Sequence, residues 1–245
     1  MKKIRFGVMG FVAAVVGVVA VAFICTGCTD GGVENGGGDA AAFLNRFRTA
    51  GTSSYYTIPF TDDRDGKTYK KVKMPDGKTW MAENLNFEAN GSSCLEEVDF
   101  TCDKYYEEYG RLYNWDAAKI SCPSGWRLPS NDDWSNLINS VGSDAATKLK
   151  SRYGWPTFDT YDANGTDDFK FSALPGGGII SKDYNPDPII MTGGFLGAWW
   201  TDTEDNVNGE SVLLYKEINY AKKYVMSGDT KKESSALSVR CILAD

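Results

Sequence analysis

The hydrophobic pattern of residues 67–82 is that of two short strands joined by a turn. In Lys67–Met74 the side chains alternate, so that Tyr69 and Val72 fall on opposite faces of an extended chain, which is the period of a β-strand. Pro75-Asp-Gly77 has the composition of a tight turn, and Lys78–Ala82 follows as a second strand. This stretch therefore predicts a β-hairpin.

The pattern changes to a helical one in the middle of the chain. Ser130-Asn-Asp-Asp133 carries an oxygen side chain at each end of a four-residue unit, the signature of a helix N-terminus. Trp134, Leu137 and Ile138 then recur at the three- and four-residue spacing that places them on one face. Gly142 is the stop signal. We predict a helix that buries these three side chains.

Short apolar runs dominate the second half of the chain. A helix is expected to begin near Asn114, and Ser143 can cap another that ends at about Ser151. The fold class predicted is α+β, with two main helices packed on small antiparallel sheets with long loops. The later strands are expected over Phe169–Leu174, Trp199–Thr201, Glu210–Ile218 and Ser234–Leu243.

The N-terminus has the organisation of an export signal. Three basic residues precede an uncharged apolar run over Phe6–Ile24, and Cys25-Thr-Gly-Cys28 follows. The last residues resemble a bacterial lipobox, in which Cys28 becomes the lipidated first residue of the mature chain. An uncleaved membrane anchor is the alternative, because the apolar run approaches the length of a spanning helix. Thr29 after the cysteine favours sorting to the outer membrane.

This organisation divides the chain into three parts. Residues 1–27 are the predicted lipoprotein signal peptide, and residues 28–54 are a Gly-rich tether in which Asp39–Ala50 has the pattern of a short helix. Residues 55–245 are the predicted domain. Either reading of the N-terminus puts the domain outside the cytoplasm and tethers it to a membrane. The lipoprotein reading places it in the cell envelope, surface-exposed or periplasmic, with the lipid bilayer as its partner through the N-terminal lipid.

Charge and histidine content exclude several function classes. Without residues 1–27 the chain has 23 basic and 33 acidic residues, a net charge of −10. Such a surface argues against nucleic acid as a partner, because phosphate binding needs Lys and Arg. The absence of histidine excludes Ser-His-Asp and Cys-His nucleophiles and histidine-ligated zinc. No cofactor is expected other than Ca²⁺ on oxygen ligands.

The cysteines fit an oxidising compartment. Once Cys25 leaves with the signal and Cys28 carries lipid, four remain, and four cysteines allow three pairings. We predict one disulfide that closes a short polar loop and one that ties the middle of the domain to its C-terminus. These bonds join Cys94 to Cys102 and Cys122 to Cys241.

Seven motifs occur in order along the predicted domain. They are Asp65–Tyr69, Lys78–Leu85, Tyr109–Ala118, Cys122–Ser130, Ala173–Gly177, Trp200–Thr203 and Ser238–Cys241. Together they resemble the Fibrobacter succinogenes major paralogous domain, and the resemblance spans roughly Tyr55 to Leu243. It implies a bacterial lipoprotein or secreted module whose fold is similar to the C-type lectin-like and formylglycine-generating-enzyme-like group, without a well-established activity.

The most recognisable residues of these motifs are expected to be structural. Aromatic residues bury large areas and dominate cores. We therefore assign core or framework roles to Trp115, Trp126, Arg127, Trp134 and Arg240, and expect the two arginines to pair with buried carboxylates such as Asp116.

Binding residues are sought in the weakly patterned loops around Cys94–Glu108, Asp159–Asp168 and Asp202–Glu210. An oxygen-rich run in the last loop fits Ca²⁺, although a solvated acidic turn explains the same residues. The candidate calcium ligands are Asp202, Glu204, Asp205, Asn206 and Asn208, and the candidate stacking residues for a ligand are Trp199, Tyr105 and Tyr106.

These observations favour a membrane-tethered extracytoplasmic binding or adhesion module, with plant-wall or another polysaccharide as the expected ligand. A structural envelope lipoprotein is the first alternative. An enzyme of the formylglycine-generating-like group is the second, and it would need reactive thiols in place of disulfides.

Overall fold

The computed structural model describes residues 54–95, 101–182, 185–191, 193–232 and 234–244. All of these belong to one compact unit of the chain, Gly51–Asp245. The predicted signal peptide, the lipidated Cys28 and the tether lie outside the described residues. Within the described ranges, no helix has both the length and the apolar character needed to cross a membrane.

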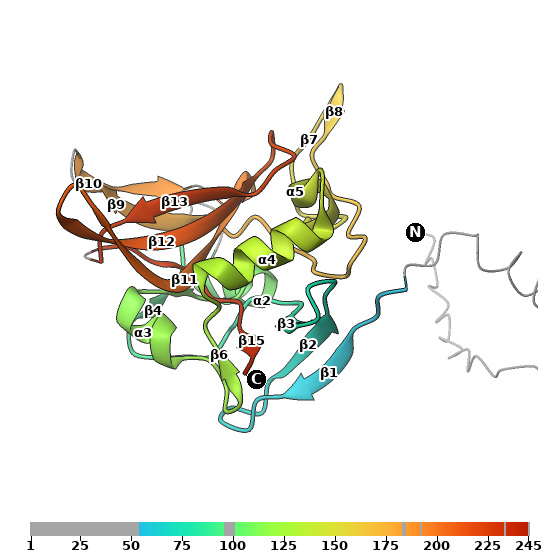
Figure 1. The fold of residues 1–245 in the computed structure, drawn as a ribbon, viewed down its shortest axis with the longest axis horizontal. Coiled ribbons are helices and arrows are strands. Elements are labelled where there is room, and N and C mark those ends of the chain that lie inside the picture. Colours follow the sequence, from blue (N-terminus) through green and yellow to red (C-terminus); the bar gives the residue numbers. More distant parts are fainter. Residues whose placement is uncertain (1–53, 96–100, 183–184, 192, 233, 245) are drawn as a thin grey trace, which may run out of the picture. The chain divides into compact units, whose positions relative to one another are not determined.

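A five-stranded sheet brings the two ends of the domain together. The predicted hairpin is confirmed, because β2 pairs antiparallel with β3. The last strand, β15, lies between β3 and β6, so the C-terminal strand is an interior strand of this sheet (Figure 1). In spatial order the strands are β1 (Ile58–Thr61), β2 (Thr68–Lys73), β3 (Thr79–Met81), β15 (Ile242–Leu243) and β6 (Trp126–Arg127).

A six-stranded sheet forms the other half of the domain. Its centre is the long antiparallel pair β11 and β12, and β14 joins the free edge of β11 as the parallel neighbour. In spatial order the strands are β13 (Met226–Thr230), β12 (Glu210–Asn219), β11 (Leu196–Val207), β14 (Leu237–Ser238), β5 (Leu112–Tyr113) and β4 (Ser92–Ser93).

Two antiparallel ribbons complete the strands. One joins β9 (Gly178–Lys182) to β10 (Asn185–Met191). The other is a short hairpin of β7 (Thr157–Phe158) and β8 (Tyr161–Asp162), which projects from one end of the domain (Figure 1). The small and mainly antiparallel sheets are as predicted. The described part of the chain is nevertheless mostly β, with four short helices, which corrects the predicted α+β class with two main helices.

Four short helices lie among the described residues. They are α2 (Cys102–Tyr109), α3 (Trp115–Ile120), α4 (Asn131–Val141) and α5 (Ala145–Leu149). The Asn114 side chain caps α3, and Ser130 with Asp133 forms the predicted capping box of α4, which ends at Gly142. The N-terminus of α5 differs from the prediction. Asp144, with a left-handed backbone, occupies the N-cap instead of Ser143.

Helix α4 joins the two large sheets through one tryptophan. The Trp134 side chain is fully buried, and its ring centroid lies 5.1 Å from that of Trp80 on β3 and 6.0 Å from that of Trp199 on β11. Phe171 contacts the same ring at 5.8 Å. The helical spacing predicted this burial, and the packing explains why the face is aromatic.

Two predicted strands are wrong as stated. Residues 169–174 are irregular, because Lys170 and Ser172 adopt positive φ and the Asp167 carboxylate accepts hydrogen bonds from Ser172 instead of leaving its amide to a ladder. The run 234–243 forms two strands in two different sheets rather than one, β14 and β15, with residues 239–241 crossing between them.

Both predicted disulfides are confirmed. Cys94 is bonded to Cys102, and Cys122 is bonded to Cys241, 119 positions further along the chain. The first bond anchors the start of α2. The second connects the end of α3 to the residue before β15, and it therefore holds the C-terminal strand in its sheet.

Asp133 links the start of α4 to the five-stranded sheet. Its buried carboxylate accepts hydrogen bonds from Lys78 Nζ at 2.6 Å, Arg127 Nη1 at 2.6 Å and the Ser130 amide at 2.8 Å. Burial alone would raise the pKa of Asp133, but these donors outweigh burial and hold it well below its usual range. Arg127 thus has the buried carboxylate partner expected of it, and the partner is Asp133.

We expect Asp133→Asn to lower the free energy of unfolding at pH 7 by about 2–3 kcal/mol, since it removes charge-assisted hydrogen bonds at a helix cap. Because the folded-state pKa is depressed, the contribution of Asp133 is complete above its unfolded value of about 3.9 and is lost as pH falls. Urea unfolding from pH 7 to pH 2.5 should show this loss in the wild type.

The matched control is Asp132→Asn, at an exposed acidic residue in the same helical turn. It should leave both the stability and the acid limb nearly unchanged. Equal acid sensitivity of the wild type and Asp133→Asn would contradict the assigned role of Asp133.

Candidate functional site

A polar and aromatic cleft of about 510 Å³ lies between β2, β3, α2 and the chain segments that follow α5. Concave sites lined by aromatic groups and a few convergent polar groups are the usual form of ligand pockets. The residues that line it include Lys67, Lys70, Glu83, Asn84, Asn86, Tyr106, Glu107, Glu108, Tyr109, Tyr153 and Ser172.

Asn84 fixes the floor of this cleft. Its Oδ1 accepts hydrogen bonds from Arg240 Nη2 at 2.9 Å and from Trp199 Nε1 at 2.8 Å, and its Nδ2 donates to the Tyr109 carbonyl at 2.8 Å. Every polar atom of the amide is therefore engaged by the protein. Gly110 packs so closely that a Cβ would lie 2.7 Å from the Leu85 carbonyl oxygen, and its φ is positive. A side chain at this position would push the floor apart.

Arg240 lies beneath the floor without a carboxylate partner among the described residues. Its guanidinium is completely buried and donates to Asn84 and to the Phe171 and Ser172 carbonyls. The guanidinium carbon lies 4.4 Å from the centroid of the Phe171 ring. Burial lowers the pKa of Arg240 to about 9. Oriented carbonyl dipoles and an aromatic face therefore compensate this charge.

This arrangement corrects the expectation that Arg240 pairs with a buried carboxylate. The carboxylate suggested for such a pair, Asp116, lies on the surface with its side chain 72% exposed, and it contacts Lys232 Nζ at 2.8 Å. Asp116 is in the first turn of α3, where an exposed acidic residue interacts favourably with the helix N-terminus.

The rim of the cleft carries the groups that remain open to a ligand. Tyr153 is 64% exposed. Glu107 and Glu108 are exposed on α2, and no ion pair is found for either within the described ranges. The Glu83 carboxylate forms an ion pair with Lys70 Nζ at 3.1 Å. The rim thus presents carboxylate acceptors and an aromatic face above a rigid floor.

Two other clefts, of about 510 and 610 Å³, meet at Trp115 and Asp116. Their charged groups neutralise one another across the opening, since Lys119 contacts Glu204 at 3.9 Å and Lys231 contacts Glu210 at 3.4 Å. The cleft above Asn84 is therefore the better candidate, because its carboxylates on α2 are not neutralised in this way.

Among models of protein families, that of the Fibrobacter succinogenes major domain matches residues 75–243 of the chain. The chain belongs to this family. No curated protein and no solved structure matches the chain.

Four of the seven ordered motifs converge on the cleft. Asp65–Tyr69 supplies Lys67 and Thr68, Lys78–Leu85 supplies Glu83 and Asn84, Tyr109–Ala118 supplies Tyr109 and Gly110, and Ala173–Gly177 supplies Leu174. The motifs build the floor and walls of the cleft, whereas the exposed rim residues Tyr153, Glu107 and Glu108 lie outside the motifs. Sequence reasoning missed Asn84 and Tyr153, although the motif containing Asn84 was recognised.

Two of the three predicted stacking residues are core residues, which corrects that prediction. Trp199 is fully buried and donates its indole N–H to Asn84. Tyr105 is 2% exposed and donates its hydroxyl to the Gly176 carbonyl at 2.5 Å, because residues 102–109 form a helix rather than a solvent-facing loop. Tyr106 lines the cleft, and the Arg111 guanidinium lies 3.9 Å from its ring centroid.

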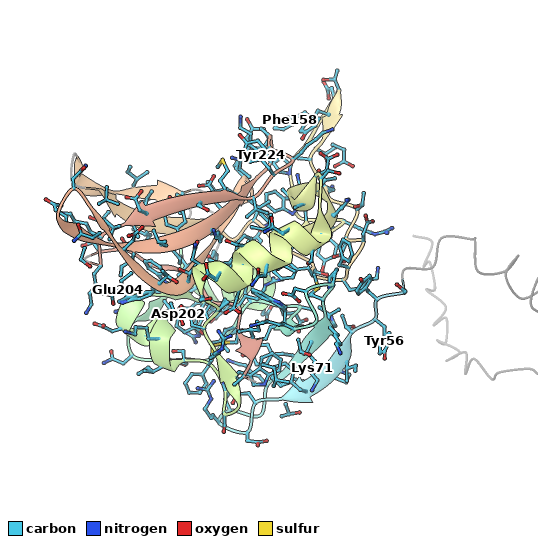
Figure 2. All side chains as sticks on the ribbon, viewed as in Figure 1. Tyr56, Lys71, Phe158, Asp202, Glu204 and Tyr224 are labelled. Atoms are coloured by element: carbon cyan, nitrogen blue, oxygen red, sulfur yellow. A yellow bond between two sulfur atoms is a disulfide. The ribbon has the colours of Figure 1, made fainter. Side chains whose placement is uncertain are left out.

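The five candidate calcium ligands are not gathered at one point. Asp202, Glu204, Asp205 and Asn206 follow one another along β11, and Asn208 lies in the turn to β12. Successive side chains of a strand point to opposite faces. Figure 2 shows Asp202 and Glu204 at the surface near α3. Within the described ranges, no group of three or more acidic, cysteine or histidine residues is arranged to hold a metal ion.

The residues assigned to the framework occupy such positions. Trp115 and Trp134 are buried, and Trp115 lies edge-on to Trp200 at 5.3 Å. Trp126 is half-buried and stacks on Phe60 at 4.5 Å. These tryptophans therefore pack the interior instead of lining the cleft.

Proposed function

We propose that this domain is a membrane-tethered extracytoplasmic binding module that holds a saccharide in the cleft above Asn84. The observation that carries the proposal is the combination of a rigid floor, in which Asn84 is fully engaged, with a rim of unneutralised carboxylates and an exposed tyrosine. Carboxylates accept hydrogen bonds from sugar hydroxyls, and an aromatic ring packs against the C–H face of a pyranose.

The state of the cysteines supports binding over thiol-dependent catalysis. All four cysteines of the domain are bonded in disulfides, so the described structure offers no thiol pair for a formylglycine-generating type of reaction. Disulfides of this kind are typical of proteins outside the cytoplasm. We therefore retain the prediction that the protein is a lipoprotein, lipidated at Cys28 and located at the outer membrane.

We also assign the domain to the C-type lectin-like fold group. Support comes from the presence of the first and last strands in one sheet, from helices packed against small antiparallel sheets, and from the disulfide next to the C-terminal strand. A fold does not determine a ligand, so the binding proposal rests on the cleft.

The test is a glycan and cell-wall polysaccharide array probed with the full chain in detergent, with calcium and with chelator. Among the ligands that bind, Tyr153→Ala and the double substitution Glu107→Gln/Glu108→Gln should each weaken affinity about tenfold. This follows because one aromatic contact or one charged hydrogen bond contributes about 1–2 kcal/mol. Isothermal titration calorimetry measures the change.

Tyr56→Ala is the matched control, because Tyr56 is 72% exposed and lies outside the cleft. It should leave affinity unchanged. Binding to no saccharide in either condition would overturn the proposal in favour of a structural envelope protein. If chelator abolishes binding and the substitutions in the cleft do not weaken it, the site would instead be at the acidic residues of β11.

A further inference from the structure

Five aromatic side chains gather at the end of the domain that carries the β7–β8 hairpin. We call this cluster the aromatic ledge. Figure 2 places two of its members, Phe158 and Tyr224, at that end of the domain. Its residues are Phe158, Tyr161, Phe195, Tyr220 and Tyr224.

Four of the five rings of the ledge remain open to solvent. Phe158, Tyr161, Phe195 and Tyr224 are exposed by 46%, 45%, 44% and 57%. Tyr220 lies at the centre, with its ring centroid 5.9 Å from that of Phe158 and 5.7 Å from that of Phe195.

Hydrogen bonds connect the three chain segments that form the ledge. The Tyr161 hydroxyl donates to the Tyr220 carbonyl at 2.9 Å, and the Tyr220 amide donates to the Phe195 carbonyl at 2.9 Å. These bonds tie β7–β8, the start of β11 and the end of β12 together. Side chains held in one arrangement before binding lose less conformational entropy when a ligand arrives.

The size of the ledge indicates what it can bind. A Phe or Tyr side chain offers 150–250 Å², so four rings exposed by about half present roughly 400 Å². The largest apolar patch on a typical monomer is about 300–600 Å² and is often functional, so the ledge has the size of such a patch. A stable protein complex buries about 800 Å² on each partner. The ledge is too small for such a partner but large enough for a few sugar rings.

The charges beside the ledge favour an uncharged ligand. The exposed residues Asp159 and Asp162 flank it on the hairpin, and Lys222 and Lys223 flank it after β12. The two signs are balanced, and Lys222 Nζ lies 5.9 Å from the centroid of the Tyr224 ring. A strongly anionic or cationic polymer would meet a like charge on one side of the rings.

We propose that the aromatic ledge is a second saccharide-binding surface, which stacks on the rings of a neutral polysaccharide of pyranoses with equatorial hydroxyls. Such sugars present a flat C–H face that matches an aromatic ring, with hydroxyls directed outward to the flanking Asp and Lys side chains. This inference rests on the proposed binding function and adds a site that the cleft does not include. Two surfaces on one domain would raise the affinity for a polymer above that for a short oligosaccharide.

The test compares cellohexaose, xylohexaose and hexagalacturonic acid in calorimetric titrations of the full chain. Phe158→Ala and Tyr224→Ala should each weaken binding of a neutral hexasaccharide by up to about tenfold, as expected for one lost aromatic contact. Tyr224→Phe keeps the ring and should bind as the wild type does. Because these side chains are about half exposed, thermal unfolding should confirm that each variant remains folded.

The outcomes separate this inference from the proposed function. If Tyr153→Ala weakens binding while Phe158→Ala and Tyr224→Ala do not, the ledge is not a binding surface and the cleft proposal stands. If no saccharide binds the wild type, both proposals are overturned. Tighter binding of hexagalacturonic acid than of the neutral oligosaccharides would overturn the neutral ligand class.

Discussion

Loss of the Cys122–Cys241 disulfide should lower the free energy of unfolding by about 4–5 kcal/mol. In the chain-entropy description, a cross-link stabilises a protein by restricting its unfolded chain, and the effect grows with the length of the closed loop. These cysteines are 119 positions apart, so their bond closes a long loop. Since domains of this kind are stable by only about 5–15 kcal/mol, the expected loss is a large part of the total.

The structure adds a local reason for this effect. Cys241 precedes β15, which pairs with β3 on one side and β6 on the other. Without the bond, this two-residue strand is held in its sheet by noncovalent contacts alone, among them the hydrogen bond from the Met81 amide to the Cys241 carbonyl at 2.9 Å. The five-stranded sheet should therefore open first in hydrogen exchange.

The experiment is guanidinium unfolding of the double variant Cys122→Ala/Cys241→Ala. The matched control is Cys94→Ala/Cys102→Ala, in which the cysteines are only 8 positions apart. The same entropy relation gives about 2–3 kcal/mol for this short loop. Equal losses for the two pairs would show that loop length does not set the stability of this domain.

The second large effect is expected at Asn84. Asn84→Ala removes the oxygen that accepts hydrogen bonds from Arg240 and Trp199. A fully buried guanidinium then loses part of its compensation, and breaking such an interaction on one side costs about 3–5 kcal/mol. We expect a loss of this size in the free energy of unfolding, measured with urea.

A double-mutant cycle isolates the interaction. Arg240→Met replaces the buried charge with an apolar side chain, so Asn84→Ala should be much less harmful in that background, with a coupling of about 2 kcal/mol. Asn86→Ala is the control, two positions along, where Nδ2 donates only to the Tyr106 carbonyl at 2.9 Å. It should cost about 1 kcal/mol. Independent effects of Asn84 and Arg240 would contradict the shared role.

Both predictions concern residues in the family motifs, and this affects where function is sought. Asn84, Arg240 and Cys241 hold the floor of the cleft and the C-terminal strand. The exposed side chains proposed to bind a ligand, such as Tyr153 and Phe158, lie between α5 and β9, in a segment that includes the β7–β8 hairpin. One framework can therefore present different rims, and loop substitutions can alter binding with little effect on folding.

Local patterns in the amino-acid sequence determined several elements correctly. The β2–β3 hairpin, the capping box of α4 and the burial of Trp134 follow from periods and caps that depend only on neighbouring residues. Cysteine spacing led to both disulfides, and the ordered motifs identified the family.

Tertiary structure alone decided the rest. The run 234–243 was expected as one strand, but its two halves find partners in different sheets, and Trp199 is taken into the core by Asn84, 115 positions earlier. The cleft and the aromatic ledge likewise combine segments that are distant in the chain. Periodicity reports which face of an element is apolar, but only long-range packing decides whether that face meets the core or stays open to a ligand.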